Sequence, residues 1–189
     1  MSEPLPLPSL LVLAGTSEAG KSTAGAYLAS RGVRRVKIRT ILQALASGVE
    51  VTHEGVASRS GFDSAEFLTG LWQVAEATTE PVIVVESFID AQLADLTRSS
   101  WPSPCAVAFI TARRRLRVGR HAAANDLTYS DSSRVVAGKD ARKQVDEQLP
   151  VWRQVADHWI DNDGTLAALE ATLSAIVTTL ACNRTDCRP

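Results

Sequence analysis

The chain has 189 residues, of which 45% are hydrophobic and 22% are charged, and its formal net charge is −1. This length suits one domain with a single core, and this composition excludes a chain that is disordered throughout. The balanced charge argues against binding to nucleic acid through bulk charge.

Cysteine content and hydropathy predict the compartment. The three cysteines have no metal-ligand spacing, and their odd number gives no disulfide framework, so we expect a reduced, cytoplasmic protein. The acidic, proline-rich start of the chain differs from a signal peptide. We find no apolar run that approaches the ~20 residues needed to cross a bilayer, and therefore expect a soluble protein.

Residues 1–8 are predicted to form an extended leader, because alternating prolines oppose both helix formation and strand pairing. An apolar run of strand length follows at residues 10–14. Residues 15–22 match the pattern G-x-x-x-x-G-K-[ST], and a helix is predicted from residue 23 to about residue 32. A strand, a glycine-rich loop and a helix in this order predict a phosphate-binding loop, in which backbone N–H groups and the helix N-terminus face phosphate oxygens.

Three side chains of this loop carry specific expectations. Lys21 should reach the β- and γ-phosphates of a nucleotide, and the Ser22 hydroxyl should ligate Mg²⁺. Glu18 is an unusual acid in such a loop. It either faces away from phosphate or helps to place the metal or the acceptor, and the sequence leaves both alternatives open.

The second strand is predicted over residues 33–38, followed by a helix over residues 41–46 that Thr40 caps. Lys37 and Arg39 would leave the end of this strand on the same side, as alternate residues of a strand do. Two cations at that position are candidates for binding an anionic acceptor.

Residues 48–62 have no clear period and are predicted to form a loop, and residues 63–77 are predicted to form an amphipathic helix. The strongest strand signal is the β-branched run at residues 82–85, which is typical of a central parallel strand buried on both faces. This strand ends in Glu86, at the sheet edge where ligands of open α/β sheets bind. The Glu86 carboxylate would hold Mg²⁺ through water or accept a proton from an acceptor hydroxyl.

A helix is predicted over residues 90–98 and another buried strand over residues 106–110. The helix that follows carries a cluster of arginines, namely Arg113, Arg114, Arg115, Arg117 and Arg120. Arg117 and Arg120 are three residues apart and therefore lie on one helix face. Together they could neutralise charge that develops on a transferred phosphoryl group.

The rest of the chain is predicted to contain an exposed polar turn region, a helix that Pro150 interrupts, a short strand, a turn, a closing amphipathic helix and a flexible tail. These elements are expected at residues 125–133, 139–148 with 151–157, 159–160, 162–164, 166–180 and 183–189. Strands that alternate with helices in this way predict an α/β fold with a parallel sheet between two helical layers.

With the phosphate-binding loop, the acid-ended strand and the arginine helix in this order, residues 10–176 resemble the P-loop small-molecule kinases. The resemblance is greatest to the group of nucleoside monophosphate kinases, such as adenylate kinase, and dephospho-CoA kinase. Residues 84–88 resemble an apolar strand of these kinases that is followed by Asp-Gly. Residues 116–120 resemble the start of the kinase lid, whose arginines close over the phosphates. Residues 156–166 are similar to the last strand and the turn beside the adenine.

The resemblance implies a three-layer P-loop fold whose five-stranded parallel sheet has the order 2-3-1-4-5. It implies a single domain over residues 9–182, with an acceptor segment at about 39–79, a small lid at about 117–137, and a tail at 183–189.

The resemblance also implies ATP and Mg²⁺ as cofactors. The implied catalytic set is Lys21, Glu86, Arg117 and Arg120, with Ser22 and Glu86 at the metal. The implied nucleotide contacts are Gly15, Thr16, Ser17, Glu18, Ala19, Gly20, Lys21, Ser22, Thr23, Arg117, Asn162 and Gly164.

The chain departs from adenylate kinases at the acceptor site. The family continues Asp-Gly-x-Pro-Arg, whereas this chain has Glu-Ser-Phe-Ile-Asp at residues 86–90 and lacks the arginine that grips an acceptor phosphate. An acid at Asp90 would repel that phosphate if it faced the site. Lys37 and Arg39, together with Arg59 from the loop, are therefore expected to bind the acceptor.

These observations predict a phosphotransferase, an ATP- and Mg²⁺-dependent kinase that acts on a small intracellular acceptor. The acceptor would be nucleoside monophosphate-like, another phosphorylated metabolite, or an alcohol. The alternative is a nucleotide-binding regulatory ATPase module that acts on a protein partner, which the missing acceptor arginine favours. No nucleic-acid or membrane partner is expected, and the protein is expected to be a monomer or a homodimer.

Overall fold

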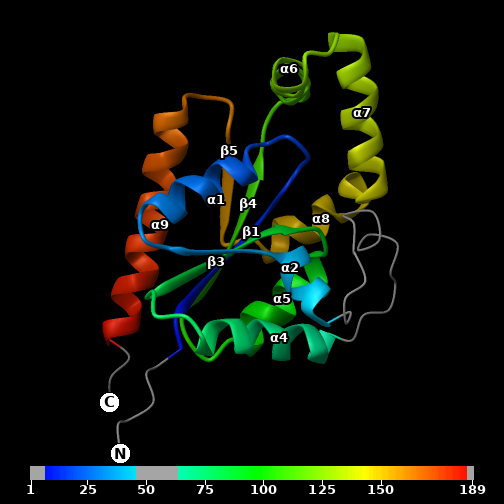
Figure 1. The fold of residues 1–189 in the computed structure, drawn as a ribbon. Helices are drawn as coiled ribbons and strands as arrows, with labels where there is room; N and C mark the ends of the chain where they lie inside the picture. Colours follow the sequence, from blue (N-terminus) through cyan, green and yellow to red (C-terminus); the bar gives the residue numbers. More distant parts are fainter. Residues whose placement is uncertain (1–6, 46–63, 187–189) are drawn as a thin grey trace, which may run out of the picture.

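The computed structural model describes residues 7–45 and 64–186, and strands alternate with helices along this part of the chain. Figure 1 shows one sheet in the middle of the molecule with helices on both faces. Within the described residues the sheet has five parallel strands in the order β2-β3-β1-β4-β5, which confirms the predicted order. The strands are β1 (Ser9–Gly15), β2 (Arg34–Lys37), β3 (Val82–Phe88), β4 (Cys105–Thr111) and β5 (His158–Asp161).

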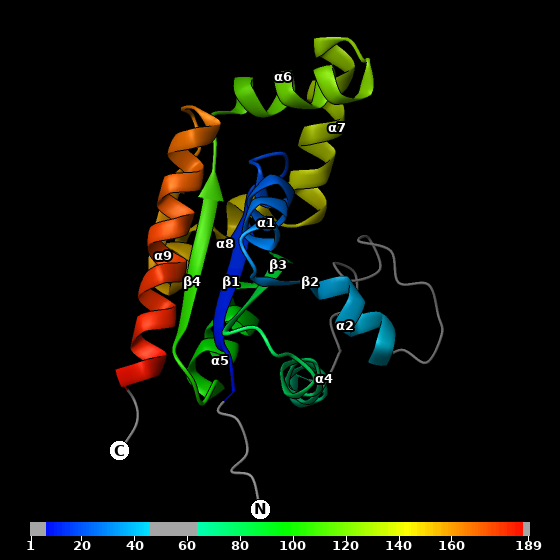
Figure 2. The ribbon, with the colours of Figure 1, turned by 60° about the vertical axis from the view of Figure 1, so that its left-hand side comes forward.

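The helices form two layers and a projecting hairpin. One face of the sheet is covered by α1 (Lys21–Ser30) and α9 (Leu166–Asp186). The apolar cluster on the other face includes residues of α2 (Ile38–Leu45), α4 (Ser64–Glu76), α5 (Ala91–Ser100) and α8 (Val145–Val155). In Figure 1 and Figure 2 a hairpin extends beyond the end of β1 where α1 begins, and it consists of α6 (Arg114–Asn125) and α7 (Tyr129–Arg142).

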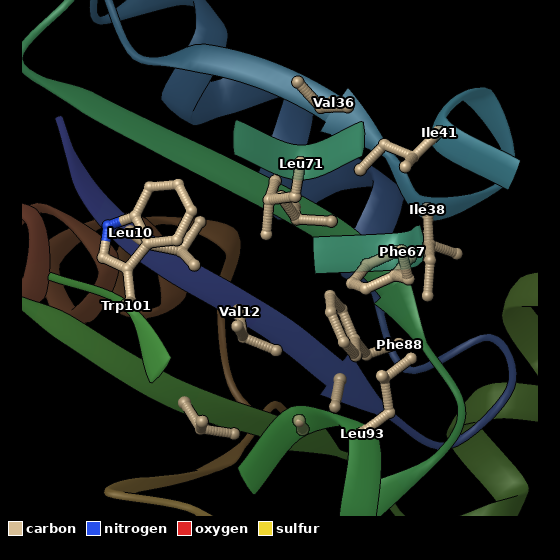
Figure 3. Close-up of a cluster of buried hydrophobic side chains, with 14 of the residues drawn as sticks. Leu10, Val12, Val36, Ile38, Ile41, Phe67, Leu71, Phe88, Leu93 and Trp101 are labelled. Carbon is tan, nitrogen blue, oxygen red and sulfur yellow. The ribbon is translucent and has the colours of Figure 1, made fainter. Parts of the chain in front are cut away.

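The core is organised by alternation along β1. Leu10 and Val12 belong to the cluster under α4, α5 and α8, whereas Leu11 and Leu13 belong to the cluster under α1 and α9. Figure 3 shows the first cluster, in which the Phe88 ring of β3 packs edge-to-face with the Phe67 ring of α4 at a centroid distance of 5.7 Å. Because β1 is buried on both faces, the loop at its end is held on a rigid support.

Two sequence predictions for the region after β4 are wrong. Residues 125–133 are not turns throughout, because α7 begins at Tyr129; the Thr128 side chain accepts a hydrogen bond from the Asp131 N–H at 3.1 Å. This Thr-x-x-Asp spacing is a capping signal that the sequence already carried. Pro150 does not interrupt a helix, because α8 runs through it and the break falls earlier, at Gln144 with φ of 48°.

Pro150 is the sixth of the eleven residues of α8 and therefore lies in the middle of its helix. A proline removes one hydrogen bond, to the carbonyl four residues before it, and here that carbonyl belongs to the first turn of α8. The helical structure is therefore continuous from α7 to α8 except for a short turn.

The closing helix is longer and more apolar than the sequence analysis allowed. It continues to Asp186, so residues 183–186 of the predicted tail are helical, and residues 187–189 lie outside the described residues. Residues 166–183 are long and apolar enough to cross a bilayer by length and composition alone, with a mean hydropathy of 1.4. In this structure the helix packs on the sheet through Leu169, Leu173, Ile176 and Leu180, and 22% of these 18 residues are buried.

The two ends of the described chain meet at the amino edge of the sheet. The Ser9 hydroxyl at the start of β1 donates a hydrogen bond to the Leu180 carbonyl of α9 at 2.9 Å, and both atoms are buried. Leu7, from the predicted leader, packs against the core, and residues 1–6 of that leader lie outside the described residues. The carboxyl edge, with the phosphate-binding loop, lies at the opposite end of β1.

Candidate active site at the carboxyl edge of the sheet

Glycines shape the loop between β1 and α1. Gly15 has φ of 142°, and a Cβ there would overlap the carbonyl oxygen of Ile110 on β4. Gly20 has φ of 104°, and a Cβ there would lie 2.6 Å from the Asn162 side-chain nitrogen. That nitrogen donates to the Ala19 carbonyl at 2.8 Å, so the turn after β5 holds the loop. Both positions require glycine because of left-handed backbone conformation and close contact.

Lys21 lies inside the loop. Its ammonium donates to the Gly15 carbonyl at 2.9 Å and to the Thr16 carbonyl at 2.6 Å. Burial, and secondarily the charge of Lys143, lowers the pKa of Lys21 from 10.5 to about 7. An anionic ligand beside this ammonium would raise its pKa again, so the site favours negative charge.

This lowered pKa predicts how folding stability depends on pH. Between about pH 7 and 10.5 the unfolded chain carries a proton on Lys21 that the folded protein has lost, so stability rises with pH in this window. The Lys21→Met variant lacks this contribution. We expect the stability of the wild type relative to Lys21→Met to rise by up to about 1.4 kcal/mol per pH unit.

Urea unfolding of both proteins at several pH values between 7 and 10 measures this difference. Lys139→Met, which removes a partly exposed ammonium near the same loop, is the control and should run parallel to the wild type. A constant difference between wild type and Lys21→Met across the window would contradict the assignment.

A cavity of about 510 Å³ opens beside the loop and below the α6–α7 hairpin. Its lining includes five cationic side chains and, among the described residues, one carboxylate, that of Glu18. The residues that line it are Ser17, Glu18, Gly20, Lys21, Ser22, Thr23, Ser87, Arg120, Ala124, Lys139, Arg142 and Lys143. Such a lining fits a polyphosphate, whose negative charge these cations would neutralise.

The two arginines predicted to act as a pair lie in different places. Arg120 lines the cavity; one of its guanidinium nitrogens donates to the Asn162 carbonyl at 2.8 Å, and the buried Nη1 has no partner among the described residues. Arg117 lies behind the loop, where its guanidinium donates to the carbonyls of Ala112 and Ser17 at 3.1 and 3.0 Å. Arg120 therefore lies at the cavity, whereas Arg117 contacts the loop itself.

Glu86 is fully buried and engaged by cations from β2. Its two carboxylate oxygens accept hydrogen bonds from Arg35, at 2.8 Å from Nη2 and 3.1 Å from Nε, and Lys37 Nζ lies 3.8 Å away. A Cβ at Gly25 of α1 would overlap Glu86 Oε2, so this glycine allows α1 to pass close to the ion pair. Glu86 is not among the residues that line the cavity.

The expected placement of Lys37 and Arg39 on one side of a strand is wrong. The strand ends at Lys37 and α2 begins at Ile38, so Arg39 is an exposed residue of the first helical turn. The alternating pair on β2 is Arg35 and Lys37, and both face Glu86. Arg59, the third expected acceptor residue, lies outside the described residues.

Sequence reasoning missed Arg35, although two signals pointed to it. Arg35 and Lys37 alternate within a predicted strand, and that strand was expected beside the one that ends in Glu86. The Arg35 Nη2 also lies 3.4 Å from the Ser22 carbonyl, so this side chain links β2, β3 and the first turn of α1.

The sequence did not decide whether the carboxylates of Glu18 and Asp90 face the phosphates, and in the structure each of them has a hydrogen-bond partner. Glu18 has φ of 59° and pairs with Lys139 of α7 at 2.7 Å. Burial raises the pKa of Glu18, but the hydrogen bond and charge of Lys139 outweigh it and the net pKa is lowered. Asp90 caps α5 by accepting from the Leu93 N–H at 2.8 Å, so this carboxylate is used by the helix.

The remaining expected residues surround the same edge. Ser87 has φ of 72° where the register of β1 with β3 shifts, and it lines the cavity. Asn162 is buried under the loop, whereas Gly164 is exposed with open space around it. Among the described residues no group of three or more His, Cys, Asp or Glu side chains is placed to hold a metal ion.

Solved structures of known proteins share this architecture. A protein named TT1252 from Thermus thermophilus is 20% identical, with a TM-score of 0.60 over 93% of this chain and 99% of that one. A gluconokinase from Sinorhizobium meliloti is also 20% identical, with a TM-score of 0.54 over 95% and 97%. A shikimate kinase from Bacteroides thetaiotaomicron is 14% identical, with a TM-score of 0.55 over 93% and 99%.

The chain has the fold of the P-loop small-molecule kinases. No protein-family model and no curated protein matches the sequence. At 14–20% identity the likeness to these three structures shows the fold alone, so the activity must be argued from the site.

Proposed function

We propose that the protein is an ATP-dependent kinase that transfers the γ-phosphoryl group to a small acceptor. The observation that carries this proposal is the cavity between the phosphate-binding loop and the α6–α7 hairpin, lined by Lys21, Arg120, Lys139, Arg142 and Lys143. Phosphoryl transfer depends mainly on positioning and on neutralising charge, and this lining supplies charge from two sides of the loop.

ATP fits the donor groups on this edge. Its phosphates would rest on the backbone N–H groups at the start of α1, with Lys21 at the β- and γ-phosphates and the Arg120 guanidinium at an outer oxygen. The Ser22 hydroxyl is the group in the lining best suited to hold Mg²⁺, which would supply positive charge beside the phosphates. Asn162 and Gly164 would lie on the nucleoside side.

The acceptor would enter between Ser87 and the hairpin, since Ser87 lies next to the last residue of β3 and lines the cavity. Lys37 of β2 remains a proposed acceptor contact, together with Arg39 and Arg59. The gluconokinase and shikimate kinase names support a small-molecule acceptor in proteins of this fold. We also propose a cytoplasmic location, because the odd number of cysteines in the sequence gives no disulfide framework.

A coupled assay of ADP release tests the proposal. The purified protein with ATP and Mg²⁺ is screened against nucleoside monophosphates, sugar phosphates, sugar acids and polyols. We expect one class of acceptor to raise ADP release at least tenfold above the rate without acceptor. ADP release that no acceptor changes, but that a protein partner alters, would favour the regulatory ATPase instead.

A further inference from the structure

Asp140 of α7 connects its own helix to α6 and to the phosphate-binding loop, which is more than 120 residues away in the sequence. Its Oδ1 accepts a hydrogen bond from the Ser17 backbone N–H of the phosphate-binding loop at 3.2 Å. Its Oδ2 accepts from the Arg117 guanidinium of α6 at 2.6 Å. The same Arg117 nitrogen also donates to the Ser17 carbonyl at 3.0 Å, so loop, α6 and α7 share one closed set of contacts.

Polar contacts hold α7 in place because its apolar contacts are few. Of its 14 residues only Ser132 and Val136 are buried among those described, and Tyr129 is 56% exposed. The end of α7 that lies nearest the loop is polar, with Lys139 paired to Glu18 and Lys143 Nζ at 3.5 Å from the Ser17 hydroxyl. The position of this end therefore depends on ion pairs and hydrogen bonds.

Asp140 faces away from the site of the phosphates. Its neighbours Lys139, Arg142 and Lys143 line the 510 Å³ cavity, whereas Asp140 lines a second cavity of about 370 Å³ together with Thr16 and Arg117. The carboxylate can therefore neutralise Arg117 from behind the loop while the neighbouring cations face the ligand.

Arg117 needs this carboxylate. The residue is 9% exposed, and its other observed partners are the neutral carbonyls of Ala112 and Ser17. A buried guanidinium without a counter-ion is strongly unfavourable, so loss of Asp140 would force Arg117 or the helix to move. Movement of α7 also takes the Asp140 acceptor away from the Ser17 N–H, and movement of Arg117 breaks its hydrogen bond to the Ser17 carbonyl.

We propose that Asp140 is a positioning residue that fixes the α7 cations over the phosphate-binding loop, acting through Ser17 and Arg117. Arg117 then helps to hold α7 against the loop through its contacts with Asp140 and Ser17. Arg120 is the arginine of the hairpin that contacts the phosphates. The proposal rests on the proposed function only in taking the larger cavity as the nucleotide site, and its first test needs no nucleotide.

The test compares Asp140→Asn with Asp131→Asn, which removes an exposed carboxylate from the first turn of the same helix. Hydrogen exchange without nucleotide should be at least tenfold faster in Asp140→Asn for the amide of Ser17 and for the last turn of α7, and unchanged in Asp131→Asn. The dissociation constant for a non-hydrolysable ATP analogue with Mg²⁺ should rise about tenfold in Asp140→Asn. Asp140→Glu, which keeps the charge, should recover part of both effects.

Variants of Arg117 and Arg120 distinguish a residue that positions α7 from one that contacts the nucleotide directly. Arg117→Lys should accelerate exchange in α7 as Asp140→Asn does, whereas Arg120→Lys should weaken analogue binding and leave exchange in α7 unchanged. If Asp140→Asn folds and its exchange is the same as in the wild type, the proposal is overturned. If Asp140→Asn does not fold, unchanged exchange in both Asp140→Glu and Arg117→Lys would overturn it. A wild type that binds no ATP analogue would overturn the proposed function, and the exchange data would still decide the role of Asp140.

Discussion

Replacing Lys21 by alanine should abolish nearly all phosphoryl transfer while leaving the protein folded. The ammonium of Lys21 is held in the loop by two carbonyl groups and is the cation nearest the expected position of the β- and γ-phosphates. Removing one such group from a transition state typically costs about 10²–10³-fold in rate. Burial lowers the pKa of this lysine, so its loss does not remove a favourable charge from the folded protein.

The measurement is kcat and KM for ATP with the acceptor found in the screen, together with the urea midpoint. Arg134→Ala is a suitable control, because Arg134 is a cation of α7 with a side chain that is 79% exposed. A folded Lys21→Ala protein with wild-type turnover would remove the basis for assigning the loop to catalysis.

Replacing Glu86 by methionine should destabilise the protein by about 3–5 kcal/mol, because the change leaves Arg35 half-buried without its carboxylate. Replacing both Glu86 and Arg35 by methionine should restore most of this loss, since the two charges are removed together. Urea unfolding of the two single variants and the double variant measures the coupling.

The same variants decide whether Glu86 also takes part in chemistry. If Glu86 only balances Arg35, the double variant should regain a large part of the wild-type kcat along with its stability. A stable double variant that stays inactive would instead support the expectation of a base or a metal-linked carboxylate. A single variant as stable as the wild type would contradict the role of the ion pair.

The fold was predictable because its signals are local. An apolar strand, a glycine loop and a helix are contiguous at residues 10–30, and the β-branched run at residues 82–85 marks a central strand without reference to any partner. The order of the strands came from the resemblance to P-loop kinases, and the sheet confirms it. The start of α2 was misplaced because Ile38 fits a strand or a helix equally well by pattern.

The site was harder to predict because it depends on pairs that are distant in sequence. Arg35 and Glu86 are 51 residues apart, and Arg117 and Asp140 meet only because α6 and α7 fold into a hairpin. Periodicity places a residue on a face but does not identify the residue opposite. The sequence therefore identified Arg117 and Arg120 as important and assigned both to phosphate, although the structure gives them different neighbours.

The hydrogen bond from Ser9 to Leu180 has a practical consequence for handling the molecule. It brings the first strand and the last helix together at the edge of the sheet that lies opposite the phosphate-binding loop (Figure 1). A reporter protein fused at either end, or a tether to a solid support, would therefore leave the cavity facing solution. The same proximity of β1 and α9 makes the fold suitable for circular permutation, with new ends opened at residues 126–128, between α6 and α7.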